Sequence, residues 1–263
     1  MQRFLLFIFL LSFMWGSVHA VKDSTQLRKH EIAIYTGYLT LSSIDELYSF
    51  QKYSGANAFG EISYTYSSGK YIHQVYTAFS SVWRTPQIAA IPSYIRFYES
   101  RYKGVYTTNY DLNYSFMRKV RQGNPGIYIS GSLLNHFNLS NDGNPEIYFS
   151  SIGAGLYITY AYKRQTIGFT SSFPLFSFVL RNNYHTSSAQ EKQSSGFEYV
   201  KENGRFYFPD KLFVVYTQVA YSYALSQRFN AGIQYGFRYI SAPEPRPLKS
   251  VSGLYSIGLT YKF

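Results

Sequence analysis

The sequence contains no cysteine, and it is poor in charge. Disulfide bonds, which hold together many small exported domains, are therefore excluded, so the fold depends on its own hydrogen bonds. Charged residues make up 15% of the 263 residues, against about 25% in a typical soluble protein. After residue 20 no stretch approaches the length and apolarity of a transmembrane helix. Such a chain spans a membrane only as a closed barrel, because lipid tolerates no unpaired backbone groups.

Aromatic residues and net positive charge are what the sequence has in excess. It carries 29 tyrosines, 22 phenylalanines and 2 tryptophans, and its formal net charge is +11. The basic residues form no continuous tract, so nucleic acid is not an expected partner. Anionic lipid head groups are the expected partner instead.

The first 20 residues have the three-part pattern of a secretory signal peptide. A basic Arg3 precedes an apolar run from Phe4 to Trp15, and Val18 and Ala20 have the spacing of a cleavage site. We expect cleavage after residue 20, a short periplasmic segment over 21–29, and one domain over 30–263.

Strict alternation of apolar and polar residues dominates the remainder. In the last thirteen residues, VSGLYSIGLTYKF, an apolar face runs from Val251 to Phe263 and a polar face includes Ser252 and Lys262. This is the two-residue period of a strand. About ten strands are expected, at 30–40, 57–68, 71–80, 101–117, 126–138, 147–162, 165–178, 211–226, 228–240 and 251–263.

The connections between these strands alternate in length. Short turns are expected near residues 67–70, 118–126, 163–165 and 226–228, and long polar links at 41–56, 81–100, 139–146, 179–210 and 241–250. This alternation is typical of outer-membrane barrels, which have brief periplasmic turns and long external loops. A soluble barrel also alternates, but its exterior would be rich in Lys and Glu, and the polar rows here have almost none.

The signal peptide, the tyrosine-rich strands and the ending GLTYKF resemble the outer-membrane β-barrel proteins of Gram-negative bacteria, in particular the small barrels of Bacteroidetes. The resemblance implies an all-β, closed antiparallel transmembrane barrel in the cell outer membrane, in contact with lipid and lipopolysaccharide. It also implies that Tyr261 and Phe263 form the signal read by the barrel-insertion machinery. It identifies no individual member.

The inward parity carries a small set of polar and charged residues, for which we predict a lumen network: Glu61, Asp111, Gln218, Gln234 and Arg238. Charges in a narrow lumen need partners. The favoured interpretation is a hydrogen-bonded plug that pairs Glu61 or Asp111 with Arg238. The alternative is the selectivity lining of a small channel.

Catalysis was considered for residues expected at the external rim. His136 and Asp142 were assigned to the region of the 139–146 link, His185 and Asp210 to the 179–210 link, and Ser132 and Ser140 flank His136. Omptin-type proteases use acidic residues with a histidine at such a rim, and lipid A deacylases use Ser and His. No spacing here enforces that geometry, and the histidines are scattered. We therefore expect no catalytic residue, no metal, no cofactor and no enzyme activity.

Three of the long links carry further expectations. Residues 42–50 have a short helical spacing with Ser43 as cap, and residues 81–100 have an apolar centre suited to a lid or a partner site. Basic residues in the 179–210 link were assigned to lipopolysaccharide phosphates: Arg181, Lys192, Lys201 and Arg205.

The function expected from the sequence is that of a non-enzymatic integral outer-membrane protein, with a structural, accessory or surface-binding role in the cell envelope. The alternatives are a small channel and an outer-membrane hydrolase. Envelope proteins that bind the external loops are possible partners.

Overall fold

A computed structural model describes residues 30–45, 49–86, 105–121, 123–139, 145–181, 200–201, 203–244 and 247–263. The expected signal peptide and the 21–29 segment lie outside these ranges. The strands are β1 (His30–Asp45), β2 (Ser49–Ser68), β3 (Tyr71–Pro86), β4 (Val105–Arg121), β5 (Gly126–Leu139), β6 (Pro145–Tyr162), β7 (Gln165–Leu180), β8 (Gly204–Tyr207), β9 (Phe213–Ala224), β10 (Phe229–Ala242) and β11 (Leu248–Lys262).

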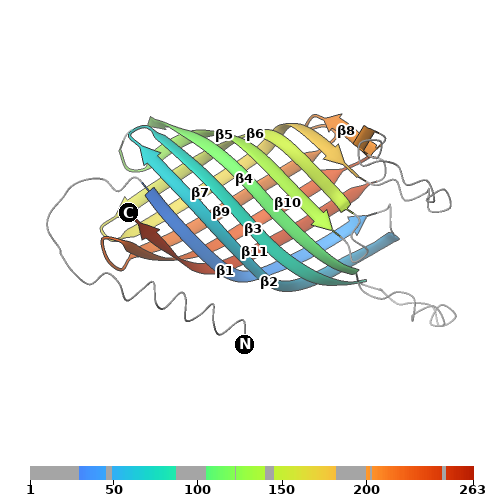
Figure 1. Cartoon of the computed structure of the whole chain (residues 1–263), viewed down its shortest axis with the longest axis horizontal. Helices are drawn as coiled ribbons and strands as arrows, with labels where there is room; N and C mark the ends of the chain where they lie inside the picture. The colour runs from blue at the N-terminus through green and yellow to red at the C-terminus, as the bar shows by residue number, and fades with distance from the viewer. Residues whose placement is uncertain are drawn as a thin grey trace.

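Ten of these strands form a closed antiparallel barrel (Figure 1). The order β6-β5-β4-β3-β2-β1-β11-β10-β9-β7 is closed by pairing of β6 with β7, and β1 pairs with β11 from Glu31↔Lys262 to Asp45↔Leu248. Closure leaves no open sheet edge along the wall, as a membrane-spanning sheet requires. The predicted fold class is therefore confirmed.

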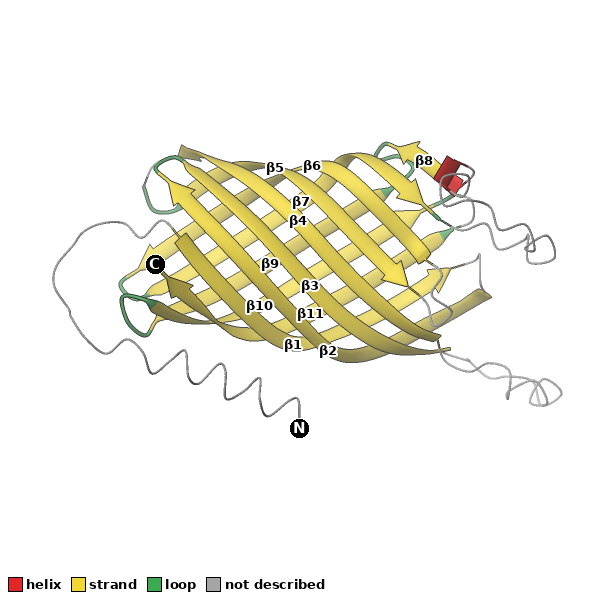
Figure 2. Ribbon diagram, in the orientation of Figure 1, coloured by secondary structure: helices red, strands yellow, loops and turns green. Residues whose placement is uncertain are grey.

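The two ends of the barrel differ in their connections. Strands β2 and β3, β4 and β5, β6 and β7, and β9 and β10 are joined by connections of two to four residues at the end where the C-terminus lies, which we call the short-turn end (Figures 1 and 2). The connections at the opposite end, which we call the long-loop end, include the three residues between β1 and β2 and the eighteen between β3 and β4. Gly69 and Lys163 adopt positive φ in the tight turns, a conformation that suits such turns.

Strand alternation separates an apolar outside from a filled inside. On β11, Val251, Tyr255 and Ile257 are exposed, whereas Ser252 and Ser256 are buried. A water-soluble exterior would not present rows of aliphatic and aromatic side chains, but lipid favours them. Within the described ranges, no helix has the length and apolarity to cross a membrane.

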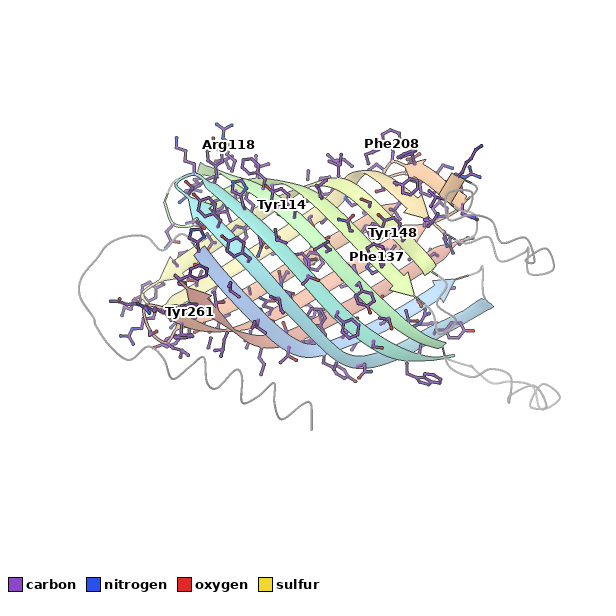
Figure 3. All side chains as sticks on the ribbon, viewed as in Figure 1. Tyr114, Arg118, Phe137, Tyr148, Phe208 and Tyr261 are labelled. Carbon is purple, nitrogen blue, oxygen red and sulfur yellow. The ribbon has the colours of Figure 1, made fainter. Side chains whose placement is uncertain are left out.

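Aromatic pairs form a band near each end of the outer wall (Figure 3). Tyr114 and Tyr261 lie toward the short-turn end, and Phe137, Tyr148 and Phe208 lie toward the long-loop end. Rings pack as Phe137 with Tyr148 at 4.5 Å and Phe229 with Tyr261 at 5.0 Å between centroids. Two aromatic bands flanking an apolar belt are typical of membrane barrels.

The strands extend further into the expected long links than the sequence predicted. Residues 41–45 and 49–56 are strand, so the predicted link over 41–56 is wrong. The helix predicted over 42–50 is wrong wherever the chain is described, since residues 42–45 belong to β1 and residues 49–50 to β2. Continuous pairing with β11 up to Asp45 explains the difference, because a short helical spacing cannot compete with a closed ladder.

The link predicted over 179–210 also contains structure. Strand β8 pairs with the end of β7, from Ser177↔Tyr207 to Leu180↔Gly204, beyond the point where β9 leaves β7 at Ser172↔Tyr216. A four-residue strand gives too short an alternation to stand out in a polar link. The apolar centre of the 81–100 link, at residues 88–91, lies outside the described residues.

Candidate functional site

The most distinctive feature of the lumen is an ion pair that crosses it. Arg238 of β10 donates from Nη1 to both carboxylate oxygens of Asp111 on β4, at 2.9 and 3.0 Å. In the ring of ten strands β4 and β10 are separated by five steps in either direction, through β5, β6, β7 and β9 or through β3, β2, β1 and β11. The pair therefore joins opposite walls of the barrel.

His136 is the third member of this contact. Its Nδ1 lies 2.7 Å from Oδ1 of Asp111 and 3.2 Å from Nη1 of Arg238. A carboxylate only accepts and a guanidinium only donates, so we assign the proton to Nδ1, donating to Asp111. The side chain of His136 is 3% exposed and packs against Phe149, with ring centroids 5.1 Å apart.

This position corrects the sequence-based placement of His136 at the external rim. His136 belongs to β5 and faces the lumen with Ser130 and Ser132, which are also buried. The parity of the strand contained that signal, because residues 130, 132 and 136 share one face. Of the other residues considered for catalysis, Asp210 is exposed in the turn before β9, and Ser140, Asp142 and His185 lie outside the described residues.

Glu61 lies in the same layer of the lumen without a hydrogen-bonded partner. Glu61 of β2 is opposite Ala78 of β3 in the sheet register. Ala78 is in turn opposite Asp111 of β4, and Asp111 is opposite His136 of β5. Glu61 makes no hydrogen bond or ion pair to any described residue, although it lies within electrostatic reach of Asp111. The structure therefore brings Arg238 to Asp111 and leaves Glu61 unpaired.

Two half-buried tyrosines, which were not singled out from the sequence, complete this layer. Tyr76 and Tyr216 lie within electrostatic reach of each other and of Asp111 and Arg238. We call the set of Glu61, Tyr76, Asp111, His136, Tyr216 and Arg238 the mid-lumen layer. Its members come from β2, β3, β4, β5, β9 and β10, so it reaches most of the way around the wall.

The two predicted glutamines form a separate contact. Gln218 of β9 donates from Nε2 to Oε1 of Gln234 on β10, at 2.6 Å. Gln218 is opposite Gly236 in register, and Arg238 is two residues further along β10. The pair thus lies on the short-turn side of Arg238 along the same strand.

Toward the short-turn end the lumen is filled by tyrosines that pack over glycines. The ring of Tyr35 covers Gly258 and reaches Gly232, where a Cβ would lie 2.5 Å from Tyr35 Cδ1 and 2.8 Å from its hydroxyl oxygen, respectively. Tyr128 and Tyr157 pack together, with centroids 5.5 Å apart. Lys262 and Glu31 form an ion pair at 3.7 Å below this layer.

Toward the long-loop end the lumen contains two apolar clusters, which were not expected from the sequence. One buried cluster lies on the β1 to β3 wall and includes Leu39, Phe59 and Val82. A second joins β6 to β11: Ile147, Phe149, Val179, Tyr207, Leu212, Val214, Ile240, Ala242 and Leu248. Several of these residues, including Val179, Tyr207 and Leu248, lie in ranges that were expected to be long links and are strand in the structure.

The basic residues assigned to lipopolysaccharide behave differently from one another. Arg181 is 3% exposed and donates to the carbonyl oxygen of Glu244 at 3.0 Å, so its assignment to a surface phosphate is wrong. Lys201 and Arg205 are exposed, and Lys192 lies outside the described residues. Lys211 bonds to Glu244 at 2.5 Å, and this hydrogen bond raises the pKa of the Lys211 ammonium.

The predicted insertion signal lies at the short-turn end of the β1–β11 junction. Phe263 donates its backbone N–H to the carbonyl oxygen of His30 at 2.9 Å, and its ring stacks on His30 at 5.5 Å. Tyr261 stacks on Phe263 at 5.9 Å. Phe263 is 50% exposed, so its ring remains accessible from outside.

No group of three His, Cys, Asp or Glu side chains in the described part of the chain has the geometry of a metal site. The mid-lumen layer contains two carboxylates, but only Asp111 is bonded to His136. Chemically, the arrangement is a buried, directional set of charge-assisted hydrogen bonds.

No protein-family model and no curated protein matches the chain. Among solved structures, the outer-membrane protease OmpT of Escherichia coli is similar over 94% of this chain and 100% of its own, with a TM-score of 0.53 and 9% identity. The COG4313 outer-membrane channel of Pseudomonas putida F1 gives a TM-score of 0.43 at 8% identity, covering 92% of this chain and 100% of the channel. The outer-membrane protein AlkL gives 0.42 at 9% identity, covering 94% and 96%. At 9% identity the likeness to OmpT shows the fold of a small outer-membrane barrel and nothing finer.

Proposed function

We propose that this protein is an integral outer-membrane barrel whose lumen is closed, and that it serves a structural or accessory role in the envelope instead of conducting solutes. One observation carries the proposal: Arg238 reaches Asp111 from the opposite wall, so a charged strut crosses the lumen. The proposal includes an orientation in the membrane: the short-turn end faces the periplasm and the long-loop end faces outward, as in other outer-membrane barrels.

The layers on either side of the strut support a closed lumen. Tyr35, Tyr128 and Tyr157 occupy the short-turn side, and the two apolar clusters occupy the long-loop side. Barrels of this strand number have interiors just wide enough to be filled by side chains. An ion crossing this lumen would have to displace both the strut and the packed layers.

Planar-bilayer recording tests the proposal. The refolded full chain should give no unit conductance steps, while a porin refolded in parallel provides the positive control. Unit steps in the wild type that disappear in Arg238→Glu, and persist in the turn variant Arg228→Glu, would identify a channel and overturn the proposal.

The proposal includes no catalytic role for the mid-lumen layer. His136 is buried and donates from Nδ1 to Asp111, which gives a substrate at the outer rim no access to its imidazole. The full chain, refolded in detergent, should leave peptide and lipid A substrates intact. Turnover that is lost in His136→Ala but retained in His73→Ala would replace this proposal with an outer-membrane hydrolase.

Insertion through the terminal aromatic belongs to the same proposal. The exposed ring of Phe263 and its stacking partner Tyr261 lie together at the short-turn end. In this orientation they face the side from which insertion machinery acts.

A further inference from the structure

A groove lies on the outer wall at the short-turn end, between β4 and β5. It has a volume of about 600 Å³, and its apolar lining includes Phe116, Val120 and Ile129. These side chains are 37%, 53% and 56% exposed. Their neighbours in sequence, Met117 and Ser130, are 5% and 7% exposed and face the lumen. The groove therefore opens toward the membrane and is separate from the mid-lumen layer.

A glycine creates the hollow. Gly131 of β5 is opposite Phe116 of β4 in register, and Ile129 is opposite Arg118. A Cβ placed on Gly131 would have no neighbour within 4 Å. Among bulky outward-facing side chains, this position leaves an open slot beside the Phe116 ring.

Basic side chains lie at one end of the slot. Arg118 and Lys70 line the groove, and both are exposed. Neither side chain makes an ion pair or hydrogen bond to any residue that the structure describes. A backbone hydrogen bond of 2.7 Å from Lys119 to the Lys70 carbonyl ties the β2–β3 turn to β4, which holds the two basic residues in place. Arg118 projects outward from the short-turn end (Figure 3).

On the groove strands β4 and β5 the one acidic side chain, Asp111, faces the lumen and is bonded to Arg238, so it does not compete for this charge. The sequence from residue 112 to residue 141 contains four basic or imidazole side chains and no Asp or Glu. On the short-turn side of β1 and β11, the acidic Glu31 is already paired with Lys262. The basic end of the groove thus lacks an intramolecular counter-ion on β4 and β5.

We infer that this groove binds an anionic phospholipid of the membrane leaflet at the short-turn end, with its phosphate on Arg118 and Lys70 and an acyl chain in the slot over Gly131. Guanidinium groups bind phosphate oxygens in bidentate geometry, and basic residues at head-group level attract anionic lipid. Lipopolysaccharide would occupy the opposite leaflet in the orientation proposed above, so the inference depends on that orientation and not on whether the lumen conducts.

The test is native mass spectrometry of the full chain refolded with phosphatidylglycerol or phosphatidylcholine. One phosphatidylglycerol should remain bound to the wild type, and phosphatidylcholine should be retained much more weakly. Each basic residue contributes roughly a five-fold factor in affinity, so Arg118→Gln with Lys70→Gln should weaken phosphatidylglycerol binding by roughly 25-fold.

Two further variants separate a built site from general basic attraction. Gly131→Leu keeps every charge but fills the slot, and it should also reduce retention several-fold. Arg164→Gln with Arg228→Gln removes two basic residues from other short turns and should leave retention unchanged. Equal loss in this control pair, unchanged retention in Gly131→Leu, or equal binding of both lipids would overturn the inference. These variants should not change the conductance measured by bilayer recording. A negative result in the lipid-binding test is therefore distinguishable from a failure of the closed-lumen proposal.

Discussion

Arg238 and Asp111 form an ion pair between strands on opposite sides of the barrel, with both carboxylate oxygens 2.9–3.0 Å from one guanidinium nitrogen. The two side chains are 12% and 14% exposed. A buried pair adds little over well-packed apolar residues, but removal of one partner leaves an uncompensated charge. We therefore expect the pair to act mainly by specifying which walls meet and at what register.

Arg238→Ala should lower the free energy of unfolding by about 3 kcal/mol, because Asp111 then loses its cation while only His136 still donates to it. Urea titration of the barrel in lipid vesicles measures this change. Arg228→Ala, in the exposed turn before β10, is the matched control and should change stability by less than about 0.5 kcal/mol.

The double variant Asp111→Ala/Arg238→Ala should lose less free energy of unfolding than the two single variants lose together. Each single variant leaves one charged side chain in the lumen without its partner, whereas the double variant removes both charges. Strict additivity would mean that the two side chains have no coupling energy, and it would contradict a stabilising contact between Arg238 and Asp111 across the lumen.

Glu61→Gln should leave the free energy of unfolding unchanged or raise it. Glu61 has no hydrogen-bonded or ion-paired partner among the described residues and lies within electrostatic reach of a second carboxylate, Asp111. Replacing the carboxylate by an amide of the same shape removes that repulsion. Asp111→Asn is the comparison, and it should cost about 2 kcal/mol because it weakens the bonds from both Arg238 and His136. Equal losses in the two variants would show that Glu61 has a partner of its own.

The alternation of apolar and polar residues along the chain allowed two features to be predicted: the barrel fold, and for most strands which residues face lipid and which face the lumen. On β11 the exposed Val251 and buried Ser252 follow the expected parity, because lipid and lumen place opposite demands on successive residues. The segment 49–56, SFQKYSGA, has no such alternation and was expected to be part of a link. Its pairing with β1 is imposed by the neighbouring strand, and that information is not local.

The lumen could be predicted in composition but not in its contacts. Parity places Asp111 and Arg238 inside, yet 127 residues separate them, and their meeting depends on the number of strands and the stagger of the closed sheet. His136 was misplaced for a different reason: it lies near the end of the strand expected at 126–138 and was grouped with the adjoining 139–146 link. The groove at Gly131 depends on an absent side chain beside Phe116, which no sequence pattern marks.

Gly258→Ala should destabilise the barrel by about 2–3 kcal/mol, in the range of overpacked cores. A Cβ at this position would lie 2.2 Å from the carbonyl oxygen of Ile34 and 2.5 Å from the Tyr35 ring, so the backbone or the ring must move. Gly60→Ala is the matched control, since a Cβ there meets nothing within 4 Å. The temperature at which the folded gel band shifts on heating measures both variants. A shift of the same size in the two would contradict close packing of Tyr35 over Gly258.

Deletion of Phe263 should slow assembly catalysed by the insertion machinery while leaving unassisted refolding in detergent nearly unchanged. The ring is 50% exposed and contacts His30 and Tyr261 only at the barrel edge, so its removal costs little packing in the finished barrel. Its backbone N–H, which donates to His30, is one bond in a ladder that continues through Lys262. Folding rates into vesicles with and without reconstituted machinery measure the two routes. Phe263→Leu separates aromatic recognition from chain length, because it retains the backbone hydrogen bond and most of the apolar area. We expect this variant to assemble more slowly than the wild type on the catalysed route and at the same rate as the wild type on the unassisted route. Equal slowing of both routes would assign Phe263 to closure of the β1–β11 seam and remove its role as an insertion signal.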